Sequence, residues 1–436
     1  MPRRMILLTH LDVWMLTAEM SKAGIGNQSL YNTLLGYAGA GYDVHVLTTS
    51  QALKAQPSPH ENITIHRRPI ASYAAYAGIK RFLRRLIPRP KPAAASGGDA
   101  CRGPKRAAKN LWRYANIFRR VMGGRATRLA GTLGGVQFVY GYEILGALAG
   151  EHAAKALAVP LVTRFQGTEL SRHLLEPDKM LACTTHVAAG RVDADLVIMA
   201  DDGTQGDKVL DALGVPKERY RFYMNGVVKD DVYRPDVDAA RLRGDLGIAD
   251  GEVFLLYAGR LCHWKRIDRM LHVAARARRA YETFKLVLIG DGEESDNCKR
   301  LSADLGLDDR VLFLGSMSHD EVMDYLNACD VYVSFYDLSN LSNSLIESCV
   351  CGKCIVTTDV GDTSHLLTDG LNGVVVPQYD DVDAIAAALV NVLKAPDLRA
   401  RLGAGARQRG TELKTWGERM RMEVEDVETM LARTRG

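Results

Sequence analysis

Two cations stand close together after a short apolar run in the second half of the chain. Arg260 directly follows Gly259, which ends the run, and Lys265 comes five residues later. If the run is a strand of a parallel sheet, both cations lie near its carboxyl edge, where α/β sheets bind ligands. An arginine fork and a lysine point charge together suit a diphosphate, whose two phosphates need donors from more than one direction. The alternative interpretation is that both are surface residues at the start of a helix.

Two other segments offer groups that fit the same ligand. Gly290 and Gly292 follow the next apolar run, and glycines allow a ligand to approach the backbone closely. A later polar segment runs from a strand into a helix, where backbone N–H groups can hold a phosphate. The candidate donor-binding residues in that segment are Ser339, Asn340, Leu341, Ser342, Asn343, Ser344, Leu345 and Glu347. Glu347 could accept hydrogen bonds from ribose hydroxyls, although Ser344-x-x-Glu347 also has the form of a helix capping box.

The elements that must position these residues are short runs rich in Val, Ile, Leu and Tyr, each followed by a helical pattern. In the first half they are Met5–His10, Val44–Thr49, Ile63–Arg67, Gln137–Tyr142, Leu161–Phe165 and Leu196–Ala200. In the second half they are Val253–Gly259, Phe284–Gly290, Val311–Gly315, Val331–Phe335, Ile355–Thr358 and Gly373–Val376. This alternation predicts an α/β protein with two successive doubly wound, Rossmann-like domains.

The domain boundaries follow from the polar segments between these runs. We expect a first domain at 1–225, a connection at 226–240 and a second domain at 241–412. Residues 413–436 should form a helix with one apolar stripe, because Trp416, Met420 and Val424 recur at helical spacing. We expect that helix to pack back across the first domain.

Positive charge is concentrated in one part of the first domain. The net charge of the 436 residues is only +4, yet residues 80–128 contain 15 Lys and Arg against the single acid Asp99. Residues 87–104 are rich in Pro, Gly and Ala and read as a flexible basic insertion. Residues 110–122 resemble a basic amphipathic helix.

The basic stretch of 80–128 has three possible interpretations. The simplest interpretation is a solvated basic face whose aromatic residues pack inward. The second is docking on an anionic membrane surface or on a negatively charged acceptor. Nucleic acid is disfavoured, because no recognisable nucleic-acid-binding motif accompanies the charge.

Composition excludes several classes of protein. No apolar run approaches the length of a transmembrane helix, and the run at 5–9 is too short for a signal sequence, so we expect a cytoplasmic protein, membrane-associated at most on the inner face. The eight cysteines show no paired spacing, which favours reduced thiols. Cys349, Cys351 and Cys354 invite a metal interpretation, but they lack a partner His or second Cys pair at zinc-ligand spacing. We predict no metal site.

Taken together, these motifs resemble glycosyltransferase family 4, the retaining GT-B enzymes. The resemblance rests on Gly259-Arg260 with Lys265, on Gly290-Asp291-Gly292, and on Glu347 before Cys351-Gly352-Lys353. Asn225-Gly226-Val227 with Tyr233-Arg234-Pro235 is similar to the interdomain segment of that family. Gly24 and Gly26 look like its N-terminal glycine-rich loop. The resemblance covers most of the chain outside roughly 75–130 and is specific only when the motifs are taken jointly.

The resemblance implies a nucleoside-diphosphate sugar, UDP- or GDP-linked, as co-substrate, with no other cofactor. Arg260 and Lys265 would bind its diphosphate and stabilise the leaving nucleotide, so no metal ion is needed. Asp-x-Asp does occur at 236–238 and 381–383, but both copies lie in polar loops. The acceptor would be a sugar, a lipid-linked acceptor or a natural product, and the anomeric configuration would be retained.

The sequence departs from the family at two places. The family has Glu-x7-Glu, whereas here Ser339 stands eight residues before Glu347, so the group expected to contact the transferred sugar is changed. On the acceptor side, similar enzymes often have a His where this chain has Gln166, and Gln cannot act as a base. Glu169 and Glu143 are alternative polar groups there, each of which could equally be an exposed carboxylate.

The same features leave alternatives to a transferase open. A nicotinamide-dependent dehydrogenase shares the doubly wound fold, but no G-x-G-x-x-G closely follows the first strand. A GT-B-like epimerase or phosphorylase is weaker still. A catalytically altered GT-B protein that acts as a binding partner fits the replacement of Glu by Ser339. Turnover of a nucleotide sugar would discriminate among them.

Overall fold

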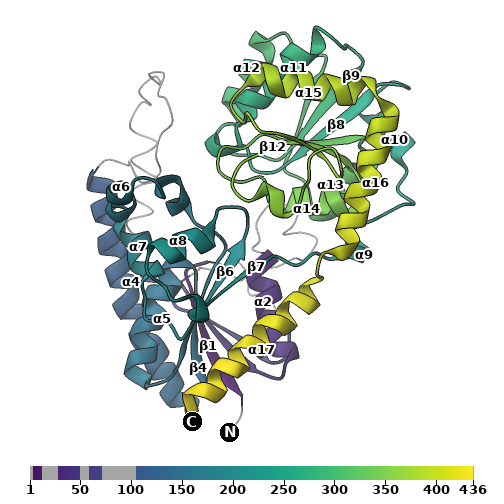
Figure 1. The fold of residues 1–436 in the computed structure, drawn as a ribbon. Helices are drawn as coiled ribbons and strands as arrows, with labels where there is room; N and C mark the ends of the chain where they lie inside the picture. The colour runs from purple at the N-terminus through teal and green to yellow at the C-terminus, as the bar shows by residue number, and fades with distance from the viewer. Residues whose placement is uncertain (1–2, 12–27, 50–57, 71–104, 436) are drawn as a thin grey trace.

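The computed structural model describes residues 3–11, 28–49, 58–70 and 105–435. Two parallel sheets lie one above the other along the molecule, each covered by helices on both faces (Figure 1). The sequence prediction of two doubly wound α/β domains is therefore confirmed. Gly24, Gly26 and the insertion at 87–104 lie outside the described residues.

The first sheet has seven strands in the order β3-β2-β1-β4-β5-β6-β7, and every pair of neighbours is parallel. Its strands are β1 (Arg4–Thr9), β2 (Asp43–Thr48), β3 (Ile63–Arg67), β4 (Phe138–Tyr142), β5 (Leu161–Phe165), β6 (Leu196–Asp201) and β7 (Tyr220–Met224). Its helices are α2 (Gln28–Gly39), α4 (Lys105–Thr132), α5 (Glu143–Leu157), η2 (Glu169–His173), α6 (Pro177–Ala182), α7 (Thr184–Gly190), α8 (Gly206–Ala212) and η3 (Lys217–Arg219).

The second sheet has six parallel strands in the order β10-β9-β8-β11-β12-β13. These are β8 (Val253–Ala258), β9 (Phe284–Ile289), β10 (Val311–Gly315), β11 (Val331–Ser334), β12 (Cys354–Thr358) and β13 (Val374–Val376). The accompanying helices are α9 (Lys229–Val232), α10 (Ala239–Asp245), η4 (His263–Lys265), α11 (Ile267–Arg278), α12 (Ser295–Asp304), α13 (His319–Ala328), α14 (Asn343–Val350), η5 (Thr363–His365), α15 (Val382–Lys394) and α16 (Pro396–Glu412). The last helix, α17 (Trp416–Arg435), packs against the first domain.

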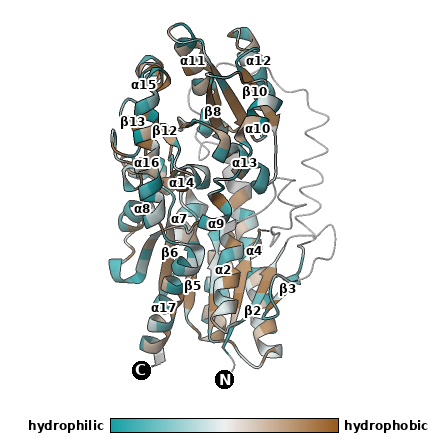
Figure 2. Cartoon of the chain, turned by 90° about the vertical axis from the view of Figure 1, so that its right-hand side faces the viewer, coloured by the Kyte–Doolittle hydropathy of each residue, from teal (hydrophilic) through white to brown (hydrophobic). Residues whose placement is uncertain are grey.

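All twelve apolar runs read from the sequence are strands, with ends shifted by no more than one residue. Strands buried on both faces read as continuous apolar runs, which is why they could be recognised. The hydrophobic colour in Figure 2 follows these strands through the middle of both domains. β7 was not predicted. It is the last strand of its sheet and is half-buried along its whole length, so its sequence Tyr-Arg-Phe-Tyr-Met shows no apolar run.

The two domains are joined by two stretches of chain that run side by side. The first leaves β7 at 225–228 and the second joins α16 to α17 at 413–415. They pair through Val227, whose N–H donates to the Lys414 carbonyl at 3.1 Å. A Cβ on Gly226 would lie 2.5 Å from Cα of Trp416, so only glycine allows the two stretches to approach this closely.

After the second crossing, α17 runs down the first domain against α2 (Figure 1). Trp416, Met420, Val424, Val427 and Leu431 are all buried in the core cluster that also contains residues of α2 and the first sheet. The C-terminal end of the chain therefore belongs structurally to the domain in which the chain begins.

A buried group of charges fixes α17 in place. Glu423 accepts from Arg164 of β5 at 2.8 Å and from Arg419, one turn earlier on α17, at 3.0 Å. The hydroxyl of Tyr140 donates to its other oxygen at 2.6 Å. Although burial alone would raise the pKa of Glu423, the two guanidinium groups hold it below its usual range. Arg164 also donates to the Ser29 hydroxyl at 2.9 Å, which ties α2 into the same group.

Within the described residues, no helix combines the length and the apolar character needed to cross a bilayer.

Replacing Glu423 with Gln should destabilise the protein by about 3–5 kcal/mol, because two buried guanidinium groups would lose their counter-charge. Asp245→Asn is the matched control: it removes an exposed ion pair with Arg241 of similar length, 2.9 Å, and the change should be within about 0.5 kcal/mol. Urea unfolding of the three proteins measures both free energies. Equal losses in the two variants would show that the buried group does not hold α17.

Candidate active site

The loops that follow β8 and β9 lie against each other at the carboxyl edge of the second sheet. The N–H of Gly259 donates to the Ile289 carbonyl at 2.9 Å, and the N–H of Leu261 donates to the Asp291 carbonyl at 3.0 Å. A Cβ on Gly290 would lie 1.9 Å from the Gly259 carbonyl oxygen, and one on Gly292 would lie 2.2 Å from that of Leu261. Both glycines are therefore required by loop packing. Their predicted contact with a ligand stays a prediction.

A pocket of about 330 Å³ opens at this edge, and it brings predicted donor residues together. Those predicted from sequence are Gly259, Arg260, Gly290, Asn343, Ser344 and Glu347. Ala258, Ile289 and Asp291 also line it. Ser316, Met317, His319 and Val322 were missed, because they follow β10 in a segment to which the sequence assigned no chemistry. Arg260 is exposed in the pocket wall, where it is free to meet an anion.

Lys265 is buried, which excludes the interpretation of an ordinary surface lysine. Its side chain reaches between two aromatic rings, with Nζ 4.2 Å from the ring centre of Trp264 and 3.7 Å from that of Tyr336. No carboxylate forms an ion pair with it within the described part of the chain. Burial lowers the pKa of Lys265 to about 7, and the positive field of Arg260 acts in the same direction. A buried ammonium held by ring faces alone is poised to gain an anionic partner.

Glu347 is not the capping residue of its helix. The N-cap of α14 is Ser342, whose hydroxyl accepts from the Leu345 N–H at 3.3 Å. Glu347 instead pairs with His319 of α13, with Oε1 2.9 Å from Nε2 of the imidazole. That hydrogen bond raises the pKa of His319. The capping-box alternative is therefore wrong, and the carboxylate of Glu347 lines the pocket with a histidine beside it.

The rest of the segment before α14 is held by internal contacts. Asn340 is fully buried and donates to the Thr358 carbonyl at 2.7 Å. Leu341 and Leu345 lie in the hydrophobic core, so only their main chains could meet a ligand. The hydroxyl of Ser339 donates to the Asp202 carbonyl of the first domain and accepts from the Leu341 N–H at 3.1 Å. Its predicted contact with the transferred sugar stays a prediction.

The Ser339 contact belongs to a direct junction between the domains. The N–H of Asp362 donates to the Gly203 carbonyl at 3.1 Å, and His365 Nδ1 lies 2.8 Å from Oδ2 of Asp201. A Cβ on Gly361 would lie 1.8 Å from that same Gly203 oxygen. The turn after β6 thus rests on the loops after β11 and β12, and both domains border the space between.

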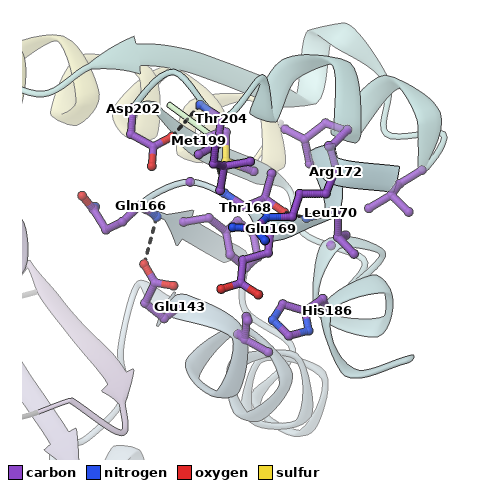
Figure 3. A pocket seen from close by; sticks show the side chains of 18 of the residues that line it. Glu143, Gln166, Thr168, Glu169, Leu170, Arg172, His186, Met199, Asp202 and Thr204 are labelled. Carbon is purple, nitrogen blue, oxygen red and sulfur yellow. Dashed lines mark hydrogen bonds between the residues drawn. The ribbon is translucent and has the colours of Figure 1, made fainter. Parts of the chain in front are cut away.

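A second pocket of about 330 Å³ lies in the first domain beside this junction (Figure 3). It contains all three residues predicted for the acceptor side, Glu143, Gln166 and Glu169. Trp264 and Leu338 of the second domain also line it, so the pocket is open to the donor side. Asp202 lies at the same rim and was missed. A polar residue directly after β6, at the carboxyl edge of the sheet, was the available signal.

Glu143 and Asp202 are carboxyl groups with unusual surroundings. Glu143 has a φ of +63°, which a non-glycine residue rarely adopts, and Oε1 accepts from the Gln166 N–H at 2.9 Å. Asp202 accepts from the Thr204 hydroxyl at 2.6 Å. Burial raises the pKa of each to about 7, and the charge of Asp202 adds to the effect on Glu143. Both groups can therefore exchange a proton near neutral pH.

The candidate metal ligands have other roles. Cys349, Cys351 and Cys354 are buried free thiols, and burial raises the pKa of each to about 12. In the two Asp-x-Asp segments, Asp238 and Asp381 cap the N-termini of α10 and α15. Among the described residues, Asp201, Asp362 and His365 offer ligand atoms within 4.8 Å of one another, but they are paired across the domain junction.

The chain is similar in sequence to known glycosyltransferases. Residues 238–409 match the family described as glycosyl transferases group 1. A D-inositol 3-phosphate glycosyltransferase from Acidothermus cellulolyticus is 30% identical over 49% of this chain, and the chain spans 50% of that relative. An α-D-kanosaminyltransferase from Streptomyces kanamyceticus is 27% identical over 85% of this chain and 90% of its own length.

Solved structures share the architecture of the whole chain. The sucrose-phosphate synthase of Thermosynechococcus elongatus superposes with a TM-score of 0.70, at 18% identity, over 99% of this chain and 100% of that one. HepE of Anabaena, solved with UDP, gives a TM-score of 0.66, at 15% identity, over 98% and 100%. The match over 238–409 favours the transferase over the dehydrogenase that the doubly wound fold left open. With its two facing Rossmann-like domains, the chain has the GT-B fold, and its second domain is similar to the glycosyl transferases group 1 family.

Proposed function

We propose that this glycosyltransferase moves a sugar from a UDP- or GDP-linked donor to an acceptor hydroxyl, with retention of configuration. The observation that carries the proposal is the buried ammonium of Lys265, which has no carboxylate partner among the described residues. It stands five residues after Arg260, and Arg260 lines the second-domain pocket. In that pocket Glu347 would accept from the ribose hydroxyls, and the main chain of α14 would face a phosphate. Transfer of a sugar also agrees with the names of the relatives that span most of the chain.

The chemistry required of the second domain is electrostatic. Negative charge grows on the leaving diphosphate as the bond between sugar and oxygen breaks, and preorganised cations stabilise that charge. Arg260 and Lys265 supply two cations, so a divalent ion is not needed for this role. Retention is proposed from the family resemblance, with the departing phosphate taking the proton of the acceptor hydroxyl. Glu143 and Asp202 are the carboxyl groups placed to assist on the acceptor side.

Arg260→Ala should lower turnover by about 10²–10³, because one charge-assisted donor to the leaving group is lost. Arg300→Ala is the matched control, since Arg300 is exposed on α12 outside the pocket lining. A panel of nucleotide sugars, followed by thermal shift and by release of nucleoside diphosphate with and without chelator, identifies the donor and tests metal independence. Stabilisation by NAD alone, or equal turnover in both variants, would contradict the proposal.

Donor affinity should depend on pH through Lys265. Because its pKa is about 7, Lys265 is half protonated near pH 7 and loses the rest of its charge as the pH rises, so nucleoside-diphosphate affinity should fall between about pH 6.5 and 8.5. Lys265→Arg keeps its charge throughout this range and should remove this fall. Calorimetric titration of both proteins with the same ligand cancels the ligand's own titration. Parallel pH profiles would mean that Lys265 does not meet the diphosphate.

We also propose that α4 places the enzyme on an anionic membrane surface. This 28-residue helix contains eight Lys and Arg and no acid. Phe118 packs inward as the simple interpretation expects, but Leu111, Trp112 and Ile117 are exposed by 44%, 37% and 44%. They share the outer surface with the exposed Arg113 and Arg120. Trp and aliphatic side chains beside arginines are typical of interfacial helices.

A second exposed apolar segment lies at the same end of the domain. Leu175 before α6 is 96% exposed and Leu181 within it is 44% exposed. Figure 1 shows α6 at the same end of the first domain as the beginning of α4. Both elements could then meet one bilayer surface.

Charge reversal of Arg113 and Arg120 to Glu should weaken binding to anionic phosphatidylglycerol vesicles by at least about thirty-fold, because each arginine near such a surface contributes about 1 kcal/mol. Arg279→Glu with Arg300→Glu makes the same charge change on the second domain and should have little effect. Co-sedimentation at low salt measures vesicle binding of both double variants and of the unaltered protein. If the unaltered protein ignores anionic vesicles, or if both double variants lose binding equally, α4 is not a membrane-binding surface.

A further inference from the structure

The lining of the first-domain pocket contains a large apolar part beside polar residues that include Glu169, Arg172 and His186. Of its lining residues, Phe165, Met199 and Leu210 belong to the main core of the domain. Leu170, Val209 and Leu213 belong to a separate small cluster around η2, α7 and α8. The pocket is therefore a gap between two apolar clusters. Protein interiors leave few voids larger than a water molecule, so 330 Å³ between such clusters is space suited to an apolar ligand.

The mouth of the same pocket is polar and lies on the donor side. Figure 3 shows Glu143, Gln166 and Asp202 along one side of the opening. Nε2 of Gln166 is buried and has no hydrogen-bond partner among the described residues, so a ligand oxygen there would satisfy it. Trp264 of the second domain closes the rim next to Lys265. A hydroxyl held at this mouth would face the proposed position of the donor diphosphate.

We infer that the acceptor is amphipathic: its reacting hydroxyl lies at the mouth beside Glu143 and Asp202, and an apolar ring or chain fills the interior. The inference rests on the proposed function, because it names the class of the second substrate of that reaction. It narrows the acceptor, since a small sugar without an apolar group would leave the walls formed by Leu170, Val209 and Leu213 in contact with water.

The reaction at the mouth balances without a further reagent. The acceptor oxygen forms a bond to the anomeric carbon while the bond from that carbon to the donor phosphate oxygen breaks. The electron pair of the broken bond stays on the diphosphate, next to Arg260 and Lys265. The hydroxyl proton passes to the departing phosphate or to the carboxylate of Glu143 or Asp202.

The test uses n-alkyl β-D-glucosides from methyl to octyl, below micelle-forming concentrations, titrated into the full chain saturated with the nucleoside diphosphate that it binds. Each methylene that enters the pocket should tighten binding about fourfold, which is ~0.8 kcal/mol per buried CH₂ converted at 1.36 kcal/mol per tenfold. The gain should level off once the interior is filled. Phenyl and cyclohexyl glucosides form a second arm: a stronger gain from the ring identifies a cyclic aglycone, and a stronger gain from the chain identifies a lipid.

Two variants locate the effect in this pocket. Val209→Phe fills the interior and should abolish the dependence on chain length. Gly190→Ala is milder, because its Cβ would lie 2.5 Å from Cδ1 of Leu213 and push that flexible side chain into the pocket, so it should reduce the dependence. Gly124→Ala is the matched control on α4, where an added Cβ meets nothing within 4 Å, and it should leave the dependence unchanged.

The outcomes separate this inference from the proposed function. If nucleoside diphosphate binds and sugar is transferred but methyl and octyl glucosides bind equally, the amphipathic acceptor is wrong while the donor assignment stands. A dependence on chain length that persists in both Val209→Phe and Gly190→Ala would likewise overturn it. If no nucleotide binds, the proposed function itself fails.

Discussion

The carboxylate of Glu423 links the last helix of the chain to the first sheet, and the geometry of the cleft depends on that link. α17 can lie on the first domain only if the chain crosses back from the second, so two crossings must fit side by side. Gly226 makes this close approach sterically allowed. With Glu423 holding the middle of α17 and Trp416 packed at its beginning, the second domain is connected to the first by two stretches of chain rather than one. Two connections restrict how the carboxyl edges of the sheets can face each other.

The junction formed by the turn after β6 builds on this restriction. Gly203 and Gly361 bring the backbones of the two domains into contact, and the hydroxyl of Ser339 bonds to the Asp202 carbonyl. Gly203 lies close to this hydroxyl, because a Cβ on Gly203 would lie 2.2 Å from the Ser339 Oγ. Where the sequence departs from the family pattern, Ser339 thus makes a contact between the domains.

Local sequence determined much of the fold but less of the site. Parallel strands and their order of appearance could be predicted because burial on both faces leaves a continuous apolar run, whereas the half-buried edge strand β7 leaves none. Arg260 and Glu347 could be assigned to one pocket because both follow strand ends. The burial of Lys265 could not be predicted, since it depends on Tyr336, a residue 71 positions away that covers it. Likewise, no local pattern indicates that Asp202 and Glu143 line one pocket, because their proximity depends on the order of β4, β5 and β6 in the sheet.

The electrostatics of the two pockets are connected through Lys265. Burial lowers the pKa of its ammonium to about 7 and raises that of the Asp202 carboxyl to about 7, and the negative field of Asp202 favours the charged form of Lys265. An anionic diphosphate beside Lys265 would stabilise the ammonium further, because opposite charges favour each other's ionised forms. The completed ammonium would in turn favour ionisation of Asp202 at the mouth of the other pocket. The negative charge of the diphosphate opposes that effect, so the ionisation of Asp202 would depend on Lys265 and on the bound diphosphate together.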